Sequence, residues 1–96
     1  MRVTIHDHPE GDAVTLRIEG KLVGAHVSEL HRAWQELGAS LGTRRLFVDL
    51  RGLMHIDEAG RNLLANMHNT RKAEFLADTP LTKYFAEQAR QKDSTR

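Results

Sequence analysis

The spacing of apolar residues changes twice along the first half of the chain, and these changes restrict the folds that it can form. In "AVTLRIE" (13–19) every second position is apolar, which predicts a strand with one buried face. Over 25–41 the apolar residues lie three or four apart, which predicts a helix. The run "LFVDL" (46–50) then predicts another strand. A helix between two strands implies a crossover connection, so the sequence predicts an α/β fold.

The helix predicted at 25–41 carries one apolar stripe and ends at Gly42. The stripe consists of Val27, Leu30, Trp34, Leu37 and Leu41. Core packing is therefore the expected role of Trp34, and an exposed indole on a partner surface is the alternative. The strand at 46–50 is almost continuously apolar, which is typical of a central parallel strand that is covered on both faces.

Two further strands are predicted at the ends of the chain. Residues Arg2 to His6 are separated from the strand at 13–19 by the turn "PEGD", so the two form an antiparallel hairpin. The segment "AEFLA" (73–77) predicts a last, short strand. The expected architecture is a mixed, roughly four-stranded sheet with helices packed against it.

Two more helices are predicted in the second half of the chain. One opens at Asp57 and ends near Asn69, and its buried stripe is expected to contain Ala59, Leu63, Leu64 and Met67. The other has Pro80 at its first position. Its inward-facing residues are expected to be Leu81, Tyr84, Phe85 and either Gln88 or Ala89.

Length and composition indicate one soluble domain. The 96 residues suit a single domain, 1–96, in which 89–96 form a frayed polar tail. A net charge of +1 gives no field that would favour nucleic acid or a membrane surface. The chain contains no cysteine, which excludes disulfides and thiol chemistry, and no segment resembles a signal peptide or membrane span. A cytoplasmic location is expected.

Two adjacent carboxylates, Asp57 and Glu58, stand where the central strand gives way to a helix. Neighbouring helical residues point about 100° apart, and the sequence offers no third partner, so a catalytic pair is not expected. A metal site is not expected either, because no second ligand lies at a suitable spacing. Asp57 is expected to cap the helix, while Glu58 either complements the helix dipole or presents a fixed charge to a partner.

The segments "GKLVGAHVSELHRAW" and "RRLFVDLRGLMHIDEAGRNLLANMH" resemble the STAS family, which includes domains of sulfate transporters and bacterial anti-sigma-factor antagonists. The resemblance covers about 16–85, and its most specific part is Asp49-Leu50 followed by Asp57 and Gly60. In phosphorylatable antagonists, the residue after this aspartate is a serine or threonine that an anti-sigma kinase modifies. Here it is Glu58, followed by Ala59, so the resemblance implies the fold and an interaction surface without phosphorylation.

The predicted function is therefore a non-enzymatic interaction module in signalling and transcription regulation, without a cofactor. Its partner would be a protein such as an anti-sigma factor, a kinase or a signalling complex. The predicted contact surface runs over a loop at 54–57 and the following helix start and consists of Met54, His55, Asp57, Glu58, Ala59, Arg61 and Asn62. Two alternatives remain: a domain that senses a small molecule or nucleotide near Arg61, and a structural relative that forms a homodimer through the edge strand at Arg2 to His6.

Overall fold

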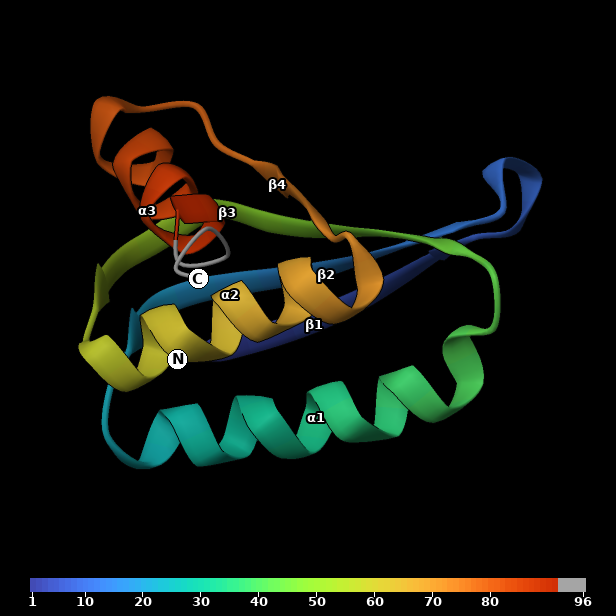
Figure 1. Cartoon of the computed structure of the whole chain (residues 1–96), viewed down its shortest axis with the longest axis horizontal. Coiled ribbons are helices and arrows are strands. Elements are labelled where there is room, and N and C mark those ends of the chain that lie inside the picture. Colours follow the sequence, from blue (N-terminus) through green and yellow to red (C-terminus); the bar gives the residue numbers. More distant parts are fainter. Residues whose placement is uncertain (92–96) are drawn as a thin grey trace.

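A computed structural model describes residues 1–91 and contains four strands and three α-helices (Figure 1). The elements are β1 (Arg2–His8), a 3-10 turn (Pro9–Gly11), β2 (Ala13–Leu22), α1 (Ala25–Leu41), β3 (Arg45–Ile56), α2 (Glu58–Arg71), β4 (Glu74–Leu76) and α3 (Pro80–Gln91). The predicted tail began too early, because residues 89–91 belong to α3 and Ala89 is fully buried. The remainder of that tail, 92–96, lies outside the described residues.

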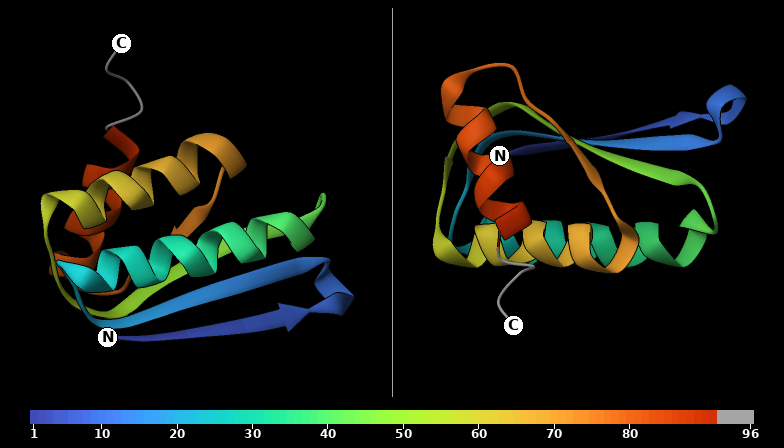
Figure 2. Two further views of the ribbon diagram at one scale, coloured as in Figure 1. Left: turned by 90° about the horizontal axis from the view of Figure 1, so that it is seen from below. Right: turned by 45° about the horizontal axis from the view of Figure 1, so that its top comes forward.

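The four strands form one mixed sheet in the order β1-β2-β3-β4, which confirms the predicted architecture. β1 pairs with β2 antiparallel, and the β2–β3 and β3–β4 pairs are parallel. The strand order advances in one direction along the sheet, so right-handed crossovers place α1 and α2 on the same face. Figure 2 shows these two helices side by side above the sheet.

The prediction that the central strand is covered on both faces is wrong. Leu46, Val48 and Leu50 are buried beneath the helices, where they join residues of α3 such as Phe85 in the core. The intervening residues lie on the opposite face, which no helix covers: Phe47 is half-buried, Asp49 is buried against the side chain of Arg51, and Arg51 itself is exposed. The reason is the shared handedness of the crossovers, which places the helical cover on one side only.

The buried faces of the later helices are confirmed in part. The predicted residues that are buried are Leu63, Leu64 and Met67 of α2 and Phe85 and Ala89 of α3. In α2, Gly60 is buried and Ala59 is exposed. In α3, Thr82 is buried, whereas Leu81 and Tyr84 are 48% and 57% exposed. The Thr82 hydroxyl accepts hydrogen bonds from the backbone N–H groups of Asp78 and Thr79, so this residue must turn toward the helix start. These hydrogen bonds of the hydroxyl therefore orient α3 so that Thr82 is the first residue of its buried face.

The segment Met54–Ile56 was predicted as part of a loop, but it forms the end of β3. β2 continues past Gly20 after a shift in register, and its last residues pair with this part of β3, Leu22 opposite Ile56. Asp57 then follows directly as the N-cap of α2. The predicted contact surface therefore begins on the end of a strand, where His55 pairs with Lys21, and continues into the first turns of α2.

Candidate functional site

Asp57 links the starts of two helices. Its Oδ1 accepts a hydrogen bond from the Gly60 amide at 2.8 Å, and its Oδ2 accepts one from the Gly24 amide at 2.9 Å. Gly24 precedes α1 and Gly60 lies in the first turn of α2, so one carboxylate joins both. These amides, the Gly24 amide first, hold the pKa of Asp57 below its usual value. The predicted cap is confirmed, and both carboxylate oxygens are engaged in it.

Gly60 permits α2 to begin close to the sheet. A Cβ atom at this position would lie 2.8 Å from the Leu22 carbonyl oxygen and 2.8 Å from Cγ1 of Ile56. Any larger residue would push the first turn of α2 away from the ends of β2 and β3. The spacing of Asp57 and Gly60 therefore fixes where the helix starts and how closely it packs.

Glu58 is the first residue of α2, and its side chain is exposed. The structure brings the seven predicted contact residues together along the end of β3 and the first turns of α2. Met54, His55, Glu58, Ala59 and Asn62 are exposed, whereas Asp57 and Arg61 are half-buried. Met54 is an unusual member, because 67% of this large apolar side chain is exposed. The surface thus combines an apolar side chain with an acid that is not needed for the cap.

The polar face of the sheet was missed by the sequence reasoning. Asp49 on β3 is only 3% exposed, and the guanidinium of Arg51 binds its two oxygens through Nε and Nη2, both at 3.0 Å. With Arg17 of β2 and His6 and His8 of β1, this pair lines a shallow hollow of about 250 Å³. The signal was present, because Asp49 and Arg51 occupy alternate positions in a run that was otherwise apolar.

We predict that the contribution of Asp49 to stability is complete above about pH 4 and is lost at lower pH. Its hydrogen bonds with Arg51 lower the pKa of Asp49 in the folded protein, so folding favours the ionised form. This contribution is complete above the unfolded pKa, about 3.9, and is lost as the pH falls through the lower folded value. Urea unfolding at pH 7 and pH 2.5 should show Asp49→Asn destabilised at pH 7 and matching wild type more closely in acid. An equal difference at both pH values would contradict this assignment.

The histidines on β1 do not assemble a metal site. The rings of His6 and His8 lie on one face with centroids 6.5 Å apart, and Nε2 of His8 is 3.1 Å from the Thr15 hydroxyl. Within residues 1–91, no group of three or more His, Cys, Asp or Glu side chains is arranged to hold a metal ion. His6 and His8 form a stacked pair at the polar face of the sheet.

Comparison with known proteins supports the fold and leaves the activity open. No family model matches the chain, and no curated protein matches it. A solved structure entitled "Crystal Structure Analysis of Mglu" matches 80% of this chain with a TM-score of 0.61 and 21% identity. The chain corresponds to only 19% of that longer chain, and at this identity the likeness shows the fold alone. In the described part of the chain, no helix has the length and apolar character needed to cross a membrane.

Proposed function

We propose that this chain is a non-enzymatic, STAS-type interaction module that binds a regulatory protein partner, such as an anti-sigma factor. The contact surface is the end of β3 with the first turns of α2, centred on Met54 and Glu58. The observation that carries the proposal is the exposure of Met54, 67%, at the register shift near the end of β3, four residues before the exposed acid Glu58. Methionine is enriched at protein interfaces relative to the rest of the surface, and a charge at the rim of an interface contributes to the choice of partner.

The role of Glu58 is to present a constant charge. Because Asp57 already caps α2 through Gly60, Glu58 is free to contact a partner. A glutamate carries one negative charge, whereas a phosphoserine carries about −1.5 to −2. The charge of the glutamate cannot be removed by a phosphatase. Binding through this surface would therefore not be switched by phosphorylation at residue 58, in contrast to the phosphorylatable antagonists that the sequence resembles.

The test is a binding measurement with a partner captured from the native host and then purified. We expect Glu58→Lys to weaken binding at least tenfold, because a charge reversal at an interface typically costs about 1.4 kcal/mol or more. Met54→Ala should weaken it as well. Glu10→Lys is the matched control, because Glu10 is an exposed acid at the tip of the β1–β2 hairpin, at the opposite end of the sheet (Figure 1).

Equal binding by wild type, Glu58→Lys and Met54→Ala would show that this surface is not the contact site. A thermal shift with nucleotides or metabolites, with no protein partner recovered, would instead favour the sensing alternative. The variants are expected to fold, because the side chains of Met54 and Glu58 are exposed.

A further inference from the structure

The outer edge of β1 is free of strand partners among residues 1–91, since the sheet order begins with β1. An unpaired edge exposes a row of backbone donors and acceptors that another strand can bind. Ile5 lies in the middle of this strand and is 48% exposed, although it points to the same side of the sheet as the buried Leu16 opposite it. The edge therefore presents both backbone groups and an apolar side chain.

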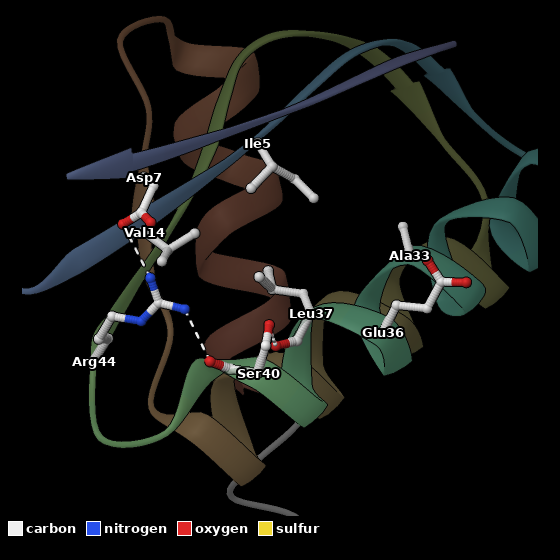
Figure 3. A pocket seen from close by; sticks show the side chains of 8 residues that line it. All are labelled: Ile5, Asp7, Val14, Ala33, Glu36, Leu37, Ser40 and Arg44. Atoms are coloured by element: carbon white, nitrogen blue, oxygen red, sulfur yellow. Dashed lines mark hydrogen bonds and ion pairs between the residues drawn. The ribbon is translucent and has the colours of Figure 1, made fainter. Parts of the chain in front are cut away.

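Beneath this edge lies a hollow of about 340 Å³ between β1 and α1 (Figure 3). Its apolar lining comes from Ile5 and Val14 on the sheet and from Ala33 and Leu37 on α1. One end is closed by Arg44, which donates to Oδ1 of Asp7 at 3.0 Å and to the Ser40 carbonyl at 2.9 Å. Because this charge pair is already satisfied, the sheet side of the hollow calls for an apolar side chain, while Glu36 on α1 is the other charged residue of its lining.

We propose that the occupant is a second copy of this chain, whose β1 pairs antiparallel with β1 across a two-fold axis. With Thr4 on the axis, Val3 stands opposite the partner's Ile5, and the partner's Val3 opposite Ile5. This register keeps every side chain on its own face of the sheet. Each pair of apolar side chains then closes the mouth of one hollow, and the two sheets join into one of eight strands.

The charges on α1 are compatible with this two-fold arrangement. Glu36 lines the hollow, and helical periodicity places Arg32 and Glu29 on the same edge of α1, one and two turns earlier. Adjacent strands lie about 4.8 Å apart, so helices over the two β2 strands would be about 14 Å apart, within reach of long side chains. The antiparallel copies then bring Arg32 toward the partner's Glu36. The net charge of only +1 does not oppose self-association.

The test is the mass of the full chain in solution, measured by light scattering and sedimentation from micromolar to several hundred micromolar. Wild type is expected to approach twice 10.9 kDa as concentration rises. Ile5→Lys should raise the dimer dissociation constant at least tenfold, with an unchanged circular dichroism spectrum. Leu81→Lys is the matched control, since Leu81 on α3 is as exposed as Ile5, 48%, lies outside both proposed surfaces and should leave the dimer intact.

A charge swap provides a variant that leaves the strand untouched. Glu36→Arg should weaken the dimer, and the double variant Glu36→Arg with Arg32→Glu should restore it, because the two charges exchange places across the axis. Wild type that stays at 10.9 kDa at several hundred micromolar would overturn the proposal, and so would a dimer that is unaffected by Ile5→Lys. Neither result bears on the contact surface at Met54 and Glu58, so the two proposals fail separately.

Discussion

Replacing Gly60 with alanine should lower the free energy of unfolding by about 1–3 kcal/mol. Alanine normally stabilises a helix relative to glycine, so the sign of this effect is informative. Here the added Cβ atom would meet the Leu22 carbonyl oxygen and the Ile56 side chain, both at 2.8 Å. The backbone oxygen cannot move without disturbing the end of β2, so the strain should exceed the gain in helix propensity. Urea unfolding monitored by circular dichroism measures the difference.

Gly38 provides the matched control for this prediction. It is also a helical glycine, but a Cβ atom there would have its nearest neighbour at 4.0 Å, the end of the flexible Arg71 side chain. Gly38→Ala should therefore raise the free energy of unfolding by about 0.5–1 kcal/mol. If both substitutions stabilised the protein, the result would contradict the close packing of α2 at Gly60 against the Leu22 carbonyl oxygen.

Replacing Asp57 with alanine should lower the melting temperature by about 4–8 °C, the shift that loss of a helix cap typically causes in a domain of this size. The substitution removes two hydrogen bonds at once, those from the amides of Gly24 and Gly60. Both amides stand at helix starts, where backbone donors have no partner within the helix. Thermal unfolding at pH 7 measures the effect.

A substitution of the neighbouring Glu58 tests whether the structural role belongs to Asp57 alone. Glu58→Ala should lower the melting temperature by less than half as much, because its side chain is exposed and makes no part of the cap. Acid provides a further check on Asp57. Its pKa is lowered in the folded protein, so the difference between wild type and Asp57→Ala should shrink as the pH falls below about 4. Equal shifts for the two alanine variants at pH 7 would contradict the division of roles.

The elements that were predicted correctly are those that can be recognised from the spacing of apolar residues within one segment. The alternation in β2 and the stripe of α1 each follow from a single period, and the buried Trp34 confirms the core interpretation. The cap at Asp57 was equally local, because it requires only an acid three residues before Gly60. Its second bond, to Gly24, was not predictable, because it joins residues 33 apart in the chain.

The errors share a non-local cause. The end of β3 was placed in a loop because nothing within Met54–Ile56 shows that β2 continues past a shift in register to pair with it. In α3, Phe85 and Ala89 were assigned correctly, whereas Leu81 and Tyr84 were wrongly placed inward instead of Thr82, because the hydroxyl bonds of Thr82 turn that residue toward the interior. The open face of the sheet depended on the handedness of two crossovers, which no single segment encodes.

The polar face of the sheet also provides a position for a probe that can be used to study both proposed surfaces. Because the helices cover only the other face, a substitution at an exposed position such as Glu74 on β4 would leave the interior unchanged. The surface ion pair of Glu74 with Arg45 would be lost, at little cost. Since the chain has no cysteine, Glu74→Cys would create a unique thiol for a spin label or fluorophore. Probes attached there would report distances between copies while leaving both Met54 and Ile5 unmodified.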